Sequence, residues 1–130
     1  MTGLDRASAI CFLVTGALVT FFGLFSVMGT LTGGVMTIAG LADGNVEIGG
    51  MGAVILVFYA IWMIACLVGG PIQIAAGIQQ FRGRPLGALH WAAVAAGMAS
   101  CVTVYCAVPG LLSFALGLAS GLAKPADTGA

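Results

Sequence analysis

The sequence predicts an all-α integral membrane protein, with four transmembrane helices in a compact bundle. Hydrophobic residues make up 61% of the 130 residues and charged residues only 6%, and the mean hydropathy is +1.16. A soluble domain carries roughly 25% charged residues and about 45 to 50% apolar ones, so this composition excludes an ordinary soluble fold. The second observation is the length of the uncharged runs, and the third is the placement of the few charges.

Eight charged side chains, four basic and four acidic, divide the chain into three long runs. The runs cover residues 7–42, residues 46–81 apart from Glu47, and residues 85–123. A bilayer core about 30 Å thick is crossed by roughly 20 helical residues, so the first and third runs are too long for one helix each. The formal net charge of zero offers no basic surface for nucleic acid.

The third run is broken at Val108-Pro109-Gly110, where proline lacks a backbone donor and glycine permits a tight turn. We expect a tight hairpin at Pro109-Gly110. This places span three at about residues 86–107 and span four at about residues 110–123. Span four is short for a full crossing unless the bilayer thins or the helix begins earlier.

The first run yields span one at about residues 8–30, and span two follows at about residues 51–78. Between them, the glycine- and threonine-rich stretch 32–50 predicts an interfacial or aqueous loop, with turn residues at Asp43-Gly44-Asn45 and Gly49-Gly50. The alternative for part of this stretch is that it continues the helix or lies on the membrane surface. Pro71 predicts a kink in span two, because proline cannot bond the carbonyl of Leu67. We expect Pro71 to face protein rather than lipid, where the freed carbonyl can find a donor.

The charges predict an orientation for these four spans. The basic residues are Arg6 before span one, Arg82 and Arg84 between spans two and three, and Lys124 after span four. Asp43 and Glu47 lie on the opposite side. The positive-inside rule then places both termini in the cytoplasm, and we expect a bacterial inner (plasma) membrane. Arg82 and Arg84 are expected to contact lipid headgroups.

Small residues recur every four positions in three of the spans. Membrane helices associate through close backbone approach and interhelical hydrogen bonds, so these stripes predict helix packing, either within one chain or between copies. The packing positions are Ser113, Gly117 and Gly121 in span four, Ala92 and Ala96 in span three, and Gly69 and Gly77 in span two.

No acid or base falls clearly inside a predicted span, and no nucleophile–base pair, phosphate loop or zinc spacing is present. The sequence therefore predicts no enzyme activity, no catalytic residue and no metal site. His90, near the start of span three, could ligate haem iron or a chlorophyll-type pigment, or could bond a backbone group or a headgroup. No other cofactor is expected.

Gln73 lies in the second half of span two. It is expected to bond another helix or the carbonyl freed by Pro71, or else to line a polar pathway. The leading functional hypothesis is a structural or accessory subunit of a homo-oligomer or of a larger membrane complex. Its partners are then the lipid bilayer and copies of itself or other membrane subunits. The alternatives are a small channel or transporter with its pathway between copies, lined by Gln73, Thr15, Thr20 and Ser26, and a pigment- or haem-associated subunit through His90.

Overall fold

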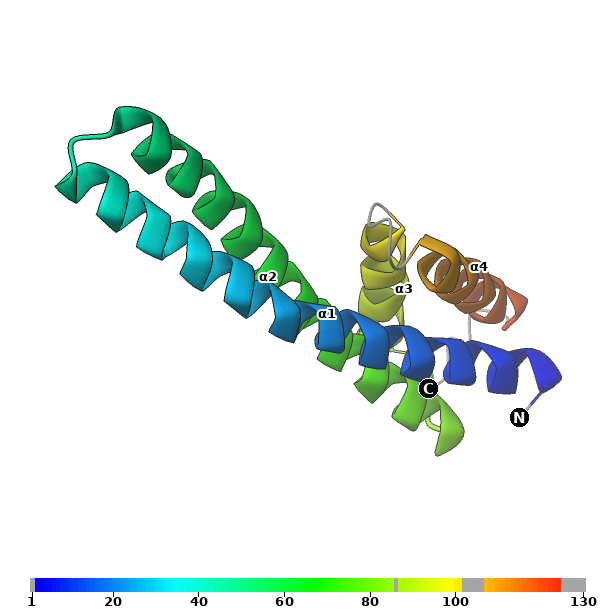
Figure 1. Ribbon diagram of the computed structural model, residues 1–130. Helices are drawn as coiled ribbons and strands as arrows, with labels where there is room; N and C mark the ends of the chain where they lie inside the picture. The colour runs from blue at the N-terminus through cyan, green and yellow to red at the C-terminus, as the bar shows by residue number, and fades with distance from the viewer. Residues whose placement is uncertain (1, 86, 102–106, 125–130) are drawn as a thin grey trace. The chain divides into compact units, whose positions relative to one another are not determined.

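A computed structural model describes residues 2–85, 87–101 and 107–124, and all of the secondary structure in these ranges is helical. The helices are α1 (Gly3–Ala42), α2 (Val46–Phe81), α3 (Ala88–Ser100) and α4 (Ala107–Ala123), shown in Figure 1. The all-helical prediction and the number of helices are therefore confirmed for the described residues.

Two of the helices, α1 and α2, are long and apolar enough to cross a membrane. With 40 and 36 residues they exceed the roughly 20 residues that one crossing requires. The 13 residues of α3 and the 17 residues of α4 correspond to about 20 Å and about 26 Å of helix. Crossing of the membrane by α3 and α4 stays a prediction.

The expected loop over residues 32–50 is wrong for most of its length. Helix α1 continues through Thr32 to Ala42, and α2 already begins at Val46. The threonine hydroxyls do not oppose the helix, because Thr32 and Thr37 each donate to the carbonyl four residues earlier, at 2.9 and 2.8 Å. The glycines cost helix propensity, but two of them, at positions 33 and 40, lie where α1 packs closely against α2.

Local capping interactions define the ends of the long helices. Thr2 and Asp5 form a reciprocal cap at the start of α1, with Thr2 N to Asp5 Oδ2 at 3.1 Å and Asp5 N to Thr2 Oγ1 at 3.2 Å. Gly44 has a φ of 69° just after α1, where left-handed backbone favours glycine. Asn45 then accepts the amide of Ile48 at 3.2 Å and caps α2. The predicted turn at Asp43-Gly44-Asn45 is confirmed.

Pro71, which was expected to kink span two, and Pro109, which was expected in a hairpin, both lie within helices. Helix α2 continues through Pro71 to Phe81, and the Pro71 side chain is exposed rather than packed against protein. Pro109 and Gly110 lie in the first turn of α4, so the hairpin expected at these residues is wrong. Proline fits there because the first amides of a helix have no partner within it. Residues 102–106, which join α3 to α4, lie outside the described residues.

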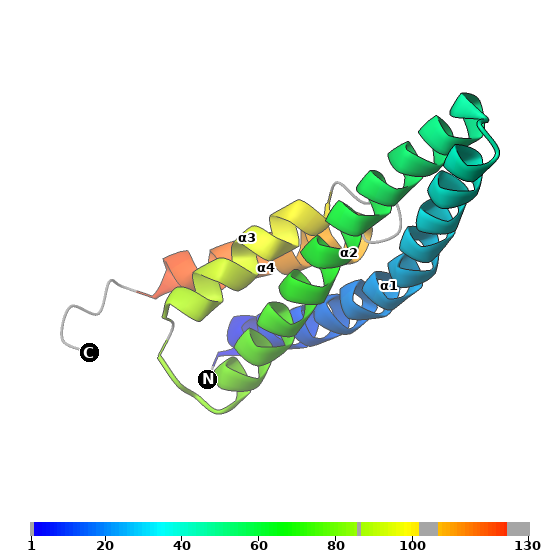
Figure 2. The same ribbon diagram turned by 90° about the vertical axis from the view of Figure 1, so that its left-hand side faces the viewer.

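The chain divides into two compact units. Unit 1 comprises Met1–Thr20 and Val68–Ala130, and it contains segments of all four helices lying side by side (Figure 2). These segments share one apolar core, which consists of Phe12 from α1, Ala76 from α2, and Ala93 and Val94 from α3. Partly buried apolar residues pack against this core: Ile72, Leu89, Phe114 and Leu118.

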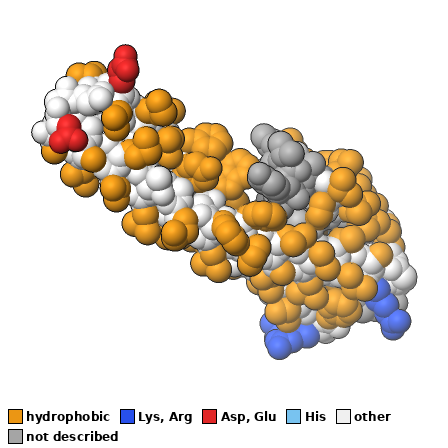
Figure 3. Space-filling model, viewed as in Figure 1, with side chains coloured by type: hydrophobic (Ala, Val, Ile, Leu, Met, Phe, Trp, Pro, Cys, Tyr) orange, Lys and Arg blue, Asp and Glu red, His pale blue; other side chains and the backbone are white. Residues whose placement is uncertain are grey.

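Unit 2 comprises Phe21–Leu67 and is a hairpin of the second half of α1 and the first half of α2. The buried residues of α1 in this unit are small and follow spacings of three and seven: Gly23, Ser26, Gly33 and Gly40. A Cβ added to Gly33 would lie 2.5 Å from the amide nitrogen of Leu56. On the side of unit 2 visible in Figure 3, hydrophobic side chains cover most of the surface. The helices of this unit therefore meet through small residues and point their large apolar side chains outward.

Candidate functional site

The interior of unit 1 is rich in polar side chains that repeat at an interval of seven residues on each helix. The pairs are Ser8 and Thr15 on α1, Gln80 and Gln73 on α2, and Ser120 and Ser113 on α4, all of them buried, while His90 and Gly97 are the corresponding buried positions on α3. Seven residues correspond to about 10.5 Å along a helix. The side chains thus form two levels, which we call the outer polar layer (Asp5, Ser8, Gln80, His90, Ser120) and the inner polar layer (Thr15, Gln73, Ser113).

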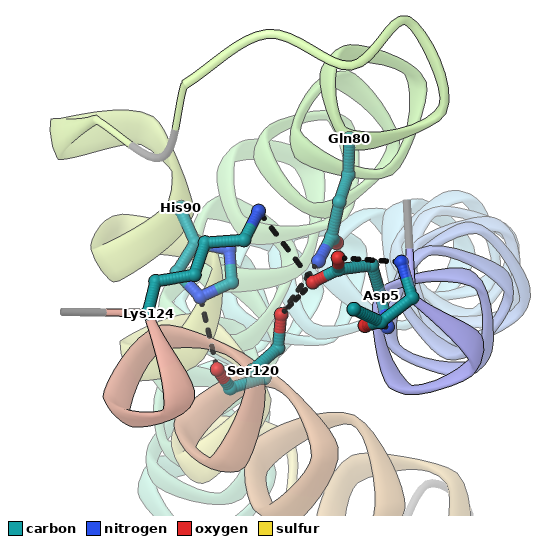
Figure 4. Close-up of polar contacts among 7 residues, drawn as sticks. Asp5, Gln80, His90, Ser120 and Lys124 are labelled. Carbon is teal, nitrogen blue, oxygen red and sulfur yellow. Dashed lines mark hydrogen bonds and ion pairs between the residues drawn. The ribbon is translucent and has the colours of Figure 1, made fainter. Parts of the chain in front are cut away.

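Ser120 is the centre of the outer polar layer. Its hydroxyl donates to Asp5 Oδ1 at 2.8 Å and accepts from Gln80 Nε2 at 2.9 Å. Lys124 Nζ lies 3.5 Å from the same carboxylate oxygen of Asp5. Figure 4 shows these side chains turned toward one another from α1, α2 and the end of α4. One serine therefore connects the first turn of α1 to the last turns of α2 and α4.

Asp5 lies in the first turn of α1, ahead of the uncharged run that begins at Ala7. Burial acts to raise the pKa of its carboxyl, but hydrogen bonds from Ser120 and Thr2 and the charge of Lys124 outweigh burial and lower the pKa from 3.8 to about 2. Asp5 is therefore a buried carboxylate that stays ionised at neutral pH. The sequence reasoning treated it as a charge outside the membrane domain and missed this role.

His90 is buried in the same layer. Its Nε2 lies 2.9 Å from the carbonyl oxygen of Gly117, and because a carbonyl can only accept, Nε2 carries the proton. Its Nδ1 is buried and has no hydrogen-bond partner. The imidazole packs edge-on against Phe12, with ring centroids 5.5 Å apart, and against Trp91, at 5.6 Å. The sequence allowed His90 either to ligate haem or a pigment or to bond a backbone group or a headgroup. In the structure its ring bonds a backbone carbonyl.

Gln73 is fully buried in the inner polar layer, and neither its Nε2 nor its Oε1 has a hydrogen-bond partner. The expected bond to another helix or to the freed carbonyl of Leu67 is therefore not made. Ser113 Oγ is likewise buried and unpartnered. Both groups border Gly97, since a Cβ added there would lie 2.7 Å from Ser113 Oγ and 3.5 Å from Gln73 Nε2. In the same layer, Thr15 donates to the Pro109 carbonyl at 3.0 Å.

Phe12 separates the two polar layers. It lies between Ser8 and Thr15 on α1 and is the largest fully buried side chain in the described part of the chain. Gly117 makes room for its ring, because a Cβ added to Gly117 would lie 2.5 Å from Phe12 Cζ. The apolar core of unit 1 thus forms a level of its own between two polar ones.

The remaining residues that were predicted to pack between helices differ in how closely they approach a neighbouring helix. A Cβ on Gly77 would meet Leu13 at 2.8 Å, and one on Gly121 would meet the Trp91 ring at 2.9 Å. Gly69 is only partly buried, with ordinary contact to Ala96. Ala92 is exposed. On α3 the small residues Ala93 and Gly97 are buried, and Ala96 is partly buried.

Arg82 and Arg84 follow the end of α2 and are exposed. Six residues with a place in the site were missed by sequence reasoning: Asp5, Ser8, Phe12, Gln80, Ser120 and Lys124. The available signal was the seven-residue spacing of polar residues, which separates Ser8 from Thr15, Gln73 from Gln80, and Ser113 from Ser120. A scan against protein-family models, a search of curated proteins and a search of solved structures found no match to this chain.

Proposed function

We propose that the protein is embedded in a membrane as a structural or accessory subunit of a homo-oligomer or of a larger membrane complex. The observation that carries this proposal is the outward surface of unit 2. Six of its large apolar side chains, three on each helix, are exposed by 57 to 71%: Phe25, Val35, Ile38, Val54, Val57, Ile61. Lipid tails or another membrane subunit are the surroundings that suit such a surface.

The burial of α2 also supports a lipid environment. Only 11% of the most apolar 18-residue window in α2 is buried inside the chain. A core helix of a soluble protein would instead be mostly buried. In the proposed arrangement α3 and α4 complete a four-span bundle, with local thinning of the bilayer offsetting their short lengths.

The orientation with both termini in the cytoplasm is part of the same proposal. In unit 1 the first turn of α1 meets the ends of α2 and α4 through the Asp5–Ser120–Gln80 contacts. Arg6, Arg82 and Lys124 belong to these three helix ends. A cluster of basic residues at one end is the arrangement that the positive-inside rule associates with the cytoplasm.

Native mass spectrometry of the detergent-solubilised protein tests the proposal. We expect an oligomer or a stoichiometric co-purifying membrane subunit. Ile61→Trp, which adds bulk to the outward face of unit 2, should weaken that association without lowering the thermal stability, because fluid lipid accommodates the ring and a packed partner does not. A wild-type chain that is strictly monomeric and brings down no partner would contradict the proposal.

The hypothesis of a channel whose pathway lies between copies receives less support, because its expected lining residues already have other surroundings. Gln73 and Thr15 face the interior of unit 1, and Thr20 and Ser26 donate to carbonyls of their own helix at 2.8 and 2.9 Å.

Haem or pigment at His90 would have to displace packed side chains, because Nε2 is bonded and Nδ1 is covered. A visible absorption band of the purified protein that is lost in His90→Ala would revive the pigment hypothesis.

A further inference from the structure

The inner polar layer contains polar atoms that the protein chain leaves without hydrogen bonds. They are Gln73 Nε2, Gln73 Oε1 and Ser113 Oγ, and all three are buried. A buried polar group that lacks a partner destabilises the folded state, so native proteins almost always supply one. Because Gln73 Nε2 and Ser113 Oγ both lie close to Gly97, one partner can serve both.

Water is the partner that fits these atoms best, because it can both donate and accept hydrogen bonds. An amide offers donors and an acceptor, and a hydroxyl offers both as well. A water molecule typically makes about three hydrogen bonds to such groups in a protein interior. A cation is a poor fit, since the layer contains no carboxylate, and a lipid chain cannot form the bonds at all.

Water would reach the inner polar layer from the side of the outer polar layer. It contains an ionised carboxylate and three unpartnered buried atoms, Ser8 Oγ, Gln80 Oε1 and His90 Nδ1. The ammonium of Lys124, whose side chain is 46% exposed, lies beside the carboxylate. The close-up in Figure 4 shows its labelled side chains gathered at the end of the four helix segments. Between this layer and Gln73 lies the apolar level whose largest buried side chain is Phe12.

We propose that unit 1 contains a water path that runs from the outer polar layer to the inner polar layer and that the Phe12 ring closes it. Water enters when the ring turns away from its place against Gly117. The neighbours of Phe12 in the core include Ala76 and Ala93, which are small enough to allow such a movement. The proposal concerns the interior of one chain and holds whether or not the protein associates with other subunits.

The test is the reactivity of a thiol placed in the inner polar layer. Ser113→Cys keeps a small polar group there, and modification at position 113 by a small, charged methanethiosulfonate reagent is followed by peptide mass spectrometry, so the native cysteines can remain. We expect slow modification with Phe12 present. In the Phe12→Ala background we expect modification at least about tenfold faster, because the rate follows the population of the open form.

Two variants serve as controls. Phe12→Leu keeps an apolar plug and should leave the rate within about twofold, and Phe21→Ala removes an exposed ring in unit 2 and should have no effect. If Phe12→Ala does not fold, Gly117→Ala replaces it, since the added Cβ would displace the Phe12 ring and should also accelerate the reaction. An unchanged rate in a folded variant overturns the proposal. Acceleration seen only with an apolar thiol reagent also overturns it, because the route would then pass through lipid.

Discussion

At the scale of single residues, the properties of unit 1 depend on small hydroxyls that connect larger polar groups. Ser120 joins a carboxylate on α1 to an amide on α2, and it is 1% exposed. By contrast, the hydroxyl of Ser26 in unit 2 donates only to the carbonyl of Phe22 in its own helix. The same residue type thus connects helices in one unit and satisfies its own helix in the other.

Ser120→Ala should therefore lower the free energy of unfolding by about 1 to 3 kcal/mol, because it leaves Asp5 and Gln80 buried with fewer partners. Ser26→Ala is the matched control and should cost less than about 1 kcal/mol, since the carbonyl it releases keeps its backbone bond. Reversible unfolding of both variants in mixed micelles measures the difference. Equal losses would show that Ser120 has no special role.

Asp5 is expected to make the stability of the folded protein fall at acid pH. Its folded-state pKa of about 2 lies below the ordinary 3.8, so its contribution is complete above pH 3.8 and is lost as the pH falls toward 2. We expect the midpoint temperature of unfolding to be constant from pH 7 to about 4 and to decline below that. Asp5→Asn should be less stable at pH 7 and should show a shallower decline. A parallel pH profile for the two proteins would contradict this assignment.

At the scale of helices, α1 and α2 pair through positions that recur at three and four residues. In unit 2, Gly33 and Gly40 of α1 face Leu56 and Gly49 of α2, close enough that an added Cβ would meet backbone. A spacing of 3.5 residues is typical of left-handed helix pairs, and small residues at the contact let the backbones approach. The four-residue stripe expected from the sequence on α2, with Gly69 and Gly77, lies in unit 1 and includes none of these positions.

The adjacent glycines at 33 and 34 provide a direct test. A Cβ at Gly33 would lie 2.5 Å from backbone, whereas one at Gly34 would meet only the tip of Leu56, at 3.9 Å. Gly33→Ala should destabilise the hairpin by about 1 to 3 kcal/mol through overpacking. Gly34→Ala should be neutral or stabilising by up to about 1 kcal/mol through helix propensity. The contact fails this test if both substitutions have the same effect on thermal unfolding in micelles.

At the scale of the whole molecule, the proposed topology places the α1–α2 connection and the α2–α3 connection on opposite sides of the membrane. Gly50 lies early in α2 and Gly87 just before α3, and a side chain added at either would meet open space. Gly50→Cys and Gly87→Cys are thus matched reporters for the two connections. In oriented membrane vesicles, an impermeant thiol reagent should modify the thiol at position 87 from the cytoplasmic side and the thiol at position 50 from the other. Modification of both from one side would contradict the proposed topology.

Much of the fold follows from local features of the chain. The helical class follows from apolar runs without strand periodicity, and the turn at Asp43-Gly44-Asn45 follows from residues that tolerate left-handed backbone and cap helices. Glycine-rich and threonine-rich helix was misjudged as loop, because its stability depends on packing against α2 and on hydroxyls that bond their own helix. Pro109 was misjudged as a hairpin residue, because proline is equally suited to the first turn of a helix.

By itself, the sequence determined that this is a helical chain with more large apolar side chains than its own interior can bury, and that it turns at Asp43-Gly44-Asn45. Only the tertiary structure decided which polar residues lie together. Asp5, Gln80 and Ser120 are separated by many residues along the chain, and their grouping depends on how α1, α2 and α4 pack in unit 1. Composition cannot show this, because burial and hydrogen bonding between distant residues arise only when the helices meet.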